Sequence, residues 1–380
     1  MAVSLSVPAR LGAYYFAFFA YIGVLAPYFS LWLAGQGYDA RQIALVLAMP
    51  QIARIFAPAA WGWIADRTGW QRGIVIFSAF TVLGGFASLY AVRGVAGMAA
   101  VMLVLSILTS GSMPLVESAA LNATRARPGS YGPVRLWGSI GFILAVLGAG
   151  AWLDRHDVST VLDILVMLAA VVCVAAFGIP SRQPHAGPFG EARIGPVLAR
   201  TDVLAFFGAC MCNAVAHGAL YAFLSIHLEA AGYSKAAIGA IWTLGSTAEI
   251  AVFVFLPQLM RRFTLRALLI ASFACIAVRF VLIGWAVDVL ALLLFAILLH
   301  AATFGVFHAA SLAAVHRIFS GRLEARGQAL YSSLTYGVGG AAGTLIAGWT
   351  WDALGPGPTF TVSALAGVLG AVLAAWKVRV

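Results

Sequence analysis

The chain has 380 residues, of which 62% are hydrophobic and 9% are charged. Ordinary soluble domains carry about 25% charged residues, and no soluble fold of this length could bury so much apolar side chain. The formal net charge of +10 would suit a nucleic-acid reader only if the basic residues formed one solvent-facing patch. They lie instead in short segments between apolar runs, so we expect no nucleic acid as a partner.

Apolar runs of about 20 residues recur along the chain, and each is long enough to cross a hydrocarbon layer roughly 30 Å thick. In lipid every backbone polar group needs an internal partner, and these runs far exceed the roughly 10 residues of a barrel strand. The sequence therefore predicts an all-α integral membrane protein with twelve transmembrane helices. The expected spans are residues 11–34, 41–65, 73–92, 96–121, 135–153, 158–180, 203–228, 236–259, 266–287, 289–315, 328–350 and 358–376.

Basic residues are unevenly distributed over the segments that join these spans. If the N-terminus is cytoplasmic, 17 of the 23 lysines and arginines lie on the inner side. The positive-inside rule then places both termini in the cytoplasm. We expect a multi-pass protein of a bacterial inner membrane, a monomer whose partners are the lipid bilayer and a small-molecule substrate.

A polar stretch rich in glycine and proline divides the chain near its middle, with six expected spans on each side. Its composition is typical of a linker. The sequence LAPYFSLWLAGQGYDARQI (25–43) aligns without gaps on LYAFLSIHLEAAGYSKAAI (220–238), at an offset of 195 residues. We therefore expect two pseudo-symmetric six-helix halves, residues 1–180 and 202–380, joined by a cytoplasmic linker at 181–201. Such a repeat is typical of carriers that rock about a central site.

Ionisable residues are rare inside the expected spans, and each costs about 2.5–3.5 kcal/mol at the bilayer centre on insertion scales. Five lie near the middle of their spans: Arg54, His217, Glu249, Arg279 and His300. We expect them around a polar cavity, with Glu249 paired to Arg279 or to its repeat counterpart Arg54. The alternative is that they are paired charges that only pack helices together. Two arginines and a protonated histidine against one glutamate would favour an anionic substrate such as a carboxylate.

Other side chains suggest weaker roles. Tyr221 lies one helical turn from His217 and is the aromatic residue that we favour for stacking on a ligand. His308 follows His300 at eight residues, which is too wide for two ligands of one metal ion, so we expect no metal. The sequence contains no nucleotide-binding loop, and we expect no cofactor.

A short motif, GWIADRTGWQR, joins the second and third expected spans. It resembles the signature loop of the major facilitator superfamily, which has a glycine, an Asp-Arg pair, a second glycine and a basic residue. Gly62, Asp66, Arg67, Gly69 and Arg72 occupy the matching positions. The resemblance implies a gating loop, with glycines that allow close helix contact and a turn. A solvated loop that only sets topology is the alternative.

A narrower resemblance covers nearly the whole chain. The stretches YGPVRLWGSIGF, LEAAGYSKAAIGAIWTLGSTAEI, AVRF and LLHAATFGVFHAA are similar to the 3-phenylpropionate permeases, relatives of the lactose permease and of nucleoside symporters. This resemblance implies substrate contacts for Glu117, Arg135 and Phe142. In the lactose permease-like branch a proton-carrying glutamate lies three residues after the histidine of the tenth span. Here His300 is followed by Thr303, which leaves Glu249 and Glu117 as candidate proton carriers.

The resemblance implies a secondary carrier that takes up an aromatic monocarboxylate by alternating access, with H⁺ as the coupling ion. A sugar or nucleoside symporter and a drug efflux carrier are alternatives. A membrane sensor without flux and a membrane-embedded enzyme are less favoured. For an enzyme, the sequence offers no paired carboxylate motif, zinc signature or activated nucleophile.

Overall fold

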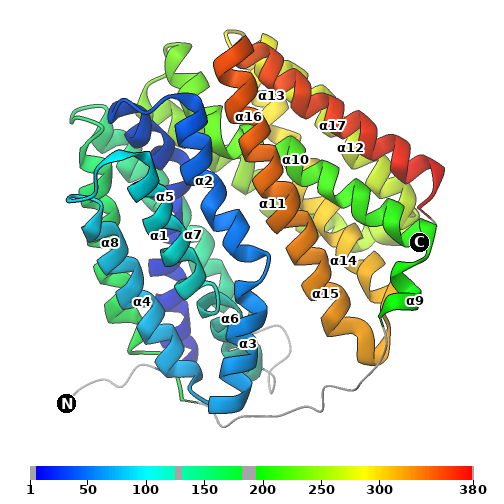
Figure 1. Cartoon of the computed structure of the whole chain (residues 1–380), viewed down its shortest axis with the longest axis horizontal. Coiled ribbons are helices and arrows are strands. Elements are labelled where there is room, and N and C mark those ends of the chain that lie inside the picture. Colours follow the sequence, from blue (N-terminus) through cyan, green and yellow to red (C-terminus); the bar gives the residue numbers. More distant parts are fainter. Residues whose placement is uncertain (1–5, 125–130, 182–193, 379–380) are drawn as a thin grey trace. The chain divides into compact units, whose positions relative to one another are not determined.

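A computed structural model (Figure 1) describes residues 6–124, 131–181 and 194–378. Regular structure in these residues is entirely helical. Contacts divide the chain into two compact units, which we treat separately. Unit 1 comprises Met1–Tyr38, Phe56–Gly187 and Ser234–Ala240, and unit 2 comprises Asp39–Ile55, Pro188–Tyr233 and Ile241–Val380. The domain boundaries expected from the sequence stay a prediction, and most of the expected linker lies outside the described residues.

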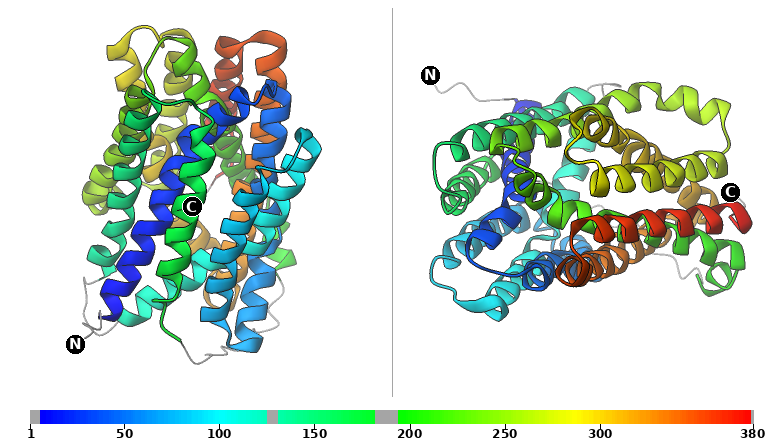
Figure 2. Two further views of the ribbon diagram at one scale, coloured as in Figure 1. Left: turned by 90° about the vertical axis from the view of Figure 1, so that its left-hand side faces the viewer. Right: turned by 90° about the horizontal axis from the view of Figure 1, so that it is seen from above.

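The helices of unit 1 are α1 (Val7–Gly35), α3 (Ala57–Thr68), α4 (Gln71–Ser88), α5 (Gly94–Thr109), α6 (Ser112–Thr124), α7 (Tyr131–Leu153) and α8 (Thr160–Ala176). Helix α1 packs along α7 and α8, as Figure 2 shows. Its contact with α7 is close because glycines leave room for the backbone. A Cβ atom placed on Gly141 would lie 2.2 Å from the carbonyl oxygen of Phe16, and one on Gly23 would lie 2.7 Å from that of Phe142.

Unit 2 contains α2 (Ala40–Arg54), α9 (Gly195–Leu198), α10 (Thr201–Ala230), α12 (Leu265–Trp285), α13 (Leu290–Leu298), α14 (Phe307–Ile318), α15 (Glu324–Ser332), α16 (Gly340–Leu354) and α17 (Pro356–Trp376), and most of α11 (Lys235–Arg262). Helix α10 packs on α16 and α17, and α17 on α12. A Cβ atom on Gly218 would lie 2.2 Å from the backbone of Gly343, so α10 and α16 touch backbone to backbone. Helix α2 packs on α16, where Arg41 and Asp352 form an ion pair of 2.8 Å.

Each expected span falls on one of these helices or on a run of them. By length and composition, nine helices in the described residues could cross a membrane, or ten if α2 and α3 count as one span. Helix α8 is apolar but shorter. The second expected span is interrupted at Ile55 and Phe56, and the boundary between the units runs through this break.

Two helices of unit 2 contain π-helical turns, in which hydrogen bonds close over five residues instead of four. The turn η1 (Ala301–Val306) lies between α13 and α14, and η3 (Ser333–Gly339) lies between α15 and α16. A short 3₁₀ turn, η2 (Gly321–Leu323), precedes α15. The π turns matter for the site because both contribute residues to the cavity of unit 2.

The repeat detected in the sequence recurs in local geometry. Two residues after the end of each of the helices α1 and α10 lies a glycine with positive φ, +83° at Gly37 and +86° at Gly232. After each glycine, a tyrosine N–H donates to the carbonyl five residues earlier, Tyr38 to Leu33 and Tyr233 to Leu228. Glycine is favoured there because it adopts positive φ without strain. Equivalent backbone turns 195 residues apart support an internal duplication.

Candidate functional site

A cavity of about 440 Å³ lies within unit 2. This volume is in the range of pockets that hold small organic ligands, roughly 300–1,000 Å³. Helices α2, α10 and α16 and the two π-turn helices supply its walls. The lining residues are Gln51, Arg54, Asn213, Ala214, His217, Gly218, Tyr221, Phe304, His308, Tyr336, Gly340 and Thr344.

Arg54 gives this cavity its permanent charge. It lies in the last turn of α2 and is exposed. Within the described residues its guanidinium makes no ion pair or hydrogen bond. One turn earlier Gln51 faces the same cavity, and its Oε1 atom is buried without a partner. A guanidinium with free donors is suited to bind a carboxylate, because its fork matches the two carboxylate oxygens.

Aromatic rings form much of the remaining wall. Phe304 stacks between His300 and His308, at ring-centroid distances of 5.3 and 6.1 Å. A hydrogen bond of 2.9 Å joins Nδ1 of His308 to the hydroxyl of Tyr336. Tyr221 lines the same cavity. An aromatic ligand could therefore contact several ring faces while its polar group reaches Arg54.

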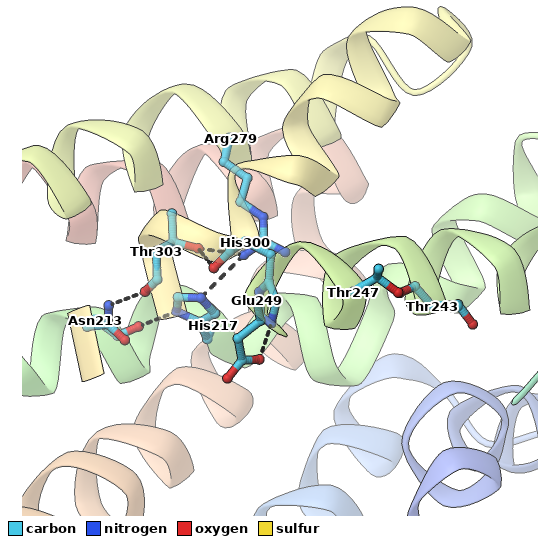
Figure 3. Close-up of polar contacts among 8 residues, drawn as sticks. All are labelled: Asn213, His217, Thr243, Thr247, Glu249, Arg279, His300 and Thr303. Carbon is cyan, nitrogen blue, oxygen red and sulfur yellow. Dashed lines mark hydrogen bonds and ion pairs between the residues drawn. The ribbon is translucent and has the colours of Figure 1, made fainter. Parts of the chain in front are cut away.

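Two of the lining residues, His217 and Asn213, form a hydrogen-bonded group with Arg279 and Thr303, which do not line the cavity; we call this group the Arg279 network (Figure 3). Arg279 on α12 is 2% exposed, and its Nη1 donates to Thr303 Oγ1 over 2.9 Å. The same nitrogen lies 3.4 Å from Nε2 of His217. The other ring nitrogen of His217 lies 2.8 Å from the carbonyl oxygen of Asn213, and the Asn213 amide donates to the carbonyl of Thr303.

Glu249 on α11 has a different partner from those we expected. Its Oε2 lies 3.7 Å from Nε2 of His300. Arg279 instead contacts Thr303, His217 and the ring of Phe280, and no ion pair of Arg54 is found among the described residues. Thr303, three residues after His300, is the residue that accepts from Arg279. A hydroxyl therefore bonds this buried arginine where a carboxylate was expected.

Glu117, Arg135 and Phe142 all lie in unit 1. The hydroxyl of Tyr131 donates to Glu117. The Arg135 guanidinium lies 4.2 Å from the ring centre of Phe19 and 5.4 Å from that of Tyr15, and it forms no ion pair with Glu117. Phe142 turns its backbone to Gly23 on α1. The roles that we gave these three residues stay predictions.

The motif begins within α3, which contains Gly62, Asp66 and Arg67, and ends at Arg72 in the first turn of α4. Gly69 ends α3 with a φ of +67°, a conformation that glycine adopts readily. The Arg67 guanidinium lies 4.3 Å from the ring centre of Trp63, and Arg72 donates to the carbonyl of Phe177 over 3.0 Å. Asp66 is exposed, and Gly62 has open space where a side chain would lie. The turn thus needs its glycine, whereas the close helix contact expected at Gly62 is absent from this structure.

A family model described as "MFS_1 like family" matches residues 9–362. The chain belongs to this family. It is therefore a multi-pass secondary transporter of the major facilitator type and not an enzyme. The MFS_1-like chain is 33% identical over 361 residues to the "Probable 3-phenylpropionic acid transporter" of Escherichia coli K12, covering 92% of this chain and 93% of that protein. The maltose permease of Geobacillus stearothermophilus is 27% identical, covering 96% and 94%.

Solved structures show the same fold. The nucleoside transporter NupG superposes with a TM-score of 0.85 at 17% identity, covering 97% of this chain and 98% of that chain. The POT family transporter PepTSo superposes with a TM-score of 0.74 at 13% identity, covering 98% and 97%. Both agree with the major facilitator fold expected for this MFS_1-like chain.

Of the five mid-span ionisable residues, Arg54 and His217 line the cavity, together with Tyr221. Arg279 lies behind His217, and Glu249 and His300 form a separate contact. We had not selected Gln51, Asn213 or Phe304 from the sequence. Their spacing was a usable signal, since Gln51 precedes Arg54 by three residues, Asn213 precedes His217 by four, and Phe304 follows His300 by four.

Proposed function

We propose that this transporter carries small aromatic monocarboxylates, with 3-phenylpropionate as the first candidate. The observation that supports this most is Arg54, a cation on the cavity wall with no partner among the described residues. A carboxylate would supply the counter-charge, and charge-assisted hydrogen bonds are the strong class of polar contact. Aromatic residues on the same wall would cover the ring of the ligand.

The name of the Escherichia coli relative points to the same chemistry. For the direction and energy of transport, we propose proton-coupled uptake by alternating access. Glu249 and His300 are the candidate proton-handling pair, because Oε2 of Glu249 and Nε2 of His300 lie within ion-pair distance, at 3.7 Å, and gain or loss of a proton by either group changes their attraction. We further propose a location in a bacterial inner membrane with cytoplasmic termini, and a monomeric state.

The first experiment measures binding and uptake of labelled 3-phenylpropionate by purified protein in liposomes. Uptake should rise when the outside is made acidic and fall when an uncoupler collapses the proton gradient. If the uncoupler leaves accumulation of labelled 3-phenylpropionate unchanged, proton coupling is contradicted. Binding without any flux would contradict the carrier proposal itself.

The cavity assignment is tested by Arg54→Gln, which should weaken binding roughly 10- to 100-fold, because a hydrogen bond to a charged group contributes about 1.5–3 kcal/mol. Arg93→Gln is a matched control, since Arg93 is an exposed arginine in unit 1 outside the cavity. Unchanged affinity in Arg54→Gln would exclude Arg54 as the carboxylate contact.

A sugar or nucleoside is the second candidate class, favoured by the maltose permease relative and by the buried unpartnered oxygen of Gln51, which could accept from a ligand hydroxyl. A thermal-shift screen with aromatic carboxylates, sugars and nucleosides separates the two classes. Stabilisation by sugars or nucleosides alone would replace our first candidate with the second.

A further inference from the structure

The Arg279 network contains two side chains that can carry a positive charge, a buried arginine and a histidine on the cavity wall. Arg279 forms no ion pair within the described residues, and His217 is 3% exposed. Arginine has five N–H donors, no acceptor, and keeps its charge in proteins. Whatever atom faces its Nη1 nitrogen must therefore act as an acceptor or be repelled.

Both nitrogens of His217 face groups with fixed roles. Nδ1 lies 2.8 Å from the carbonyl oxygen of Asn213, which can only accept, so Nδ1 must carry a hydrogen. Nε2 lies 3.4 Å from Nη1 of Arg279, which can only donate, so Nε2 must present its lone pair. The two constraints together select one neutral tautomer.

We propose that Arg279 is a positioning residue that holds His217 in the neutral Nδ1–H tautomer, so that His217 presents an uncharged ring to the cavity and carries no transported proton. Thr303 accepts a second bond from Arg279 Nη1, and Asn213 bonds both His217 and Thr303, which keeps the partners in place. Proton coupling then falls to the Glu249–His300 pair.

The proposal deepens the proposed function and rests on it. With His217 neutral, Arg54 is the permanent cation among the lining residues of the cavity. Such a cavity matches a ligand with one negative charge. It should prefer 3-phenylpropionate to a dicarboxylate of similar size such as phenylsuccinate.

The direct test is ¹⁵N NMR of the whole protein labelled at its seven histidines, because protonated and unprotonated ring nitrogens differ widely in chemical shift. The resonances lost in His217→Gln identify the residue. We expect one protonated and one unprotonated nitrogen, unchanged from about pH 8 to about pH 5, the interval in which an ordinary histidine gains its charge. Two protonated nitrogens at the lower pH, or protonation of Nε2 alone, would overturn the proposal.

A second test removes the constraint. In Arg279→Met, His217 is free to become charged, and carboxylate affinity should rise about tenfold as the pH falls, the effect of one added charge-assisted bond. Other titratable or charged groups near His217 are Glu249 on α11, His300 on the α13–η1 helix, Arg54 on α2, His308 on α14, Tyr336 on η3 and Tyr221 on its own helix.

These neighbours are unchanged in Arg279→Met/His217→Phe, so the new pH dependence should disappear there. Its persistence would show that another group is responsible and would contradict the proposal. The NMR measurement needs neither ligand nor flux. It can be made even if the Arg279→Met variant does not fold, because it does not use that variant. Failure of the tautomer assignment is therefore distinguishable from failure of the carrier proposal.

Discussion

Units 1 and 2 resemble each other in local backbone geometry and differ in how they hold positive charge. Each ends a long helix with the same glycine turn, 195 residues apart. In unit 1, Arg135 lies against the rings of Phe19 and Tyr15. In unit 2, Arg279 is buried and bonded to neutral acceptors, while Arg54 faces a cavity. The two units thus share a backbone turn, whereas their arginines have different partners.

This difference shows that a count of intramembrane arginines overstates the number available to a ligand. Arg279 uses Nη1 for Thr303 and His217. The Arg135 guanidinium lies over two aromatic rings, whereas the donors of Arg54 have no hydrogen-bond partner in the described part of the chain. An arginine is a candidate ligand contact when its guanidinium donors have no partner within the protein, whatever its depth in the membrane.

The largest expected effect tests whether both units depend on close backbone contact. Gly141→Ala in unit 1 and Gly218→Ala in unit 2 each place a Cβ atom 2.2 Å from backbone of a neighbouring helix. Backbone cannot rotate away, so each change should lower the free energy of unfolding by on the order of 3 kcal/mol. Chemical unfolding in detergent micelles measures this.

Gly84→Ala is the control, because the space around Gly84 is open. A loss confined to one of the two variants would mean that the units differ in backbone packing as well as in charge.

An intermediate effect separates Arg135 from Arg54. Arg135→Gln removes a cation from two aromatic rings and should cost about 1 kcal/mol of stability. Arg54→Gln should change stability by less than about 0.5 kcal/mol, the usual range for a side chain without such contacts. The same unfolding measurement compares them, and equal losses would contradict the distinction between stacked and available arginines.

The smallest effect concerns two repeat-related helix starts. Asp39 caps α2, accepting from Gln42 N–H over 2.8 Å while the Gln42 side chain accepts from Asp39 N–H. Ser234 caps α11 with one bond of 3.2 Å, and Asp154 accepts from the next two amides. Asp39→Ala should cost about 1 kcal/mol and Ser234→Ala about 0.5 kcal/mol. A reversed order would show that Asp154 does not share the capping of α11.

Sequence reasoning recovered the helical membrane fold, because apolar length and backbone satisfaction in lipid leave few alternatives. It also identified two equivalent turns, since Gly37 and Gly232 both adopt a positive φ that favours glycine. The break at Ile55 has a sequence signal that we did not use, because Pro58 lies in the first turn of α3 and has no N–H to donate to the carbonyl of Arg54.

The candidate site was recovered in part. Ionisable residues are rare within the expected spans, and on this basis we selected Arg54, His217 and Arg279 as candidate cavity residues. It could not assign partners, because Arg279, Thr303 and Asn213 come from segments far apart in the chain and each could bond several groups. The neutral tautomer of His217 depends on two distances that periodicity does not contain.

The turns η1 and η3 have a consequence for comparing sequences. Each π turn holds one residue more than the α turn that would replace it. Residues of α14 and α16 are therefore rotated by about 100° from where an uninterrupted helical wheel would put them. An alignment with a relative that lacks either turn needs a single-residue gap within Ala301–Val306 or Ser333–Gly339. Without that gap, the equivalents of His308 and Thr344 would be assigned to the wrong helix face.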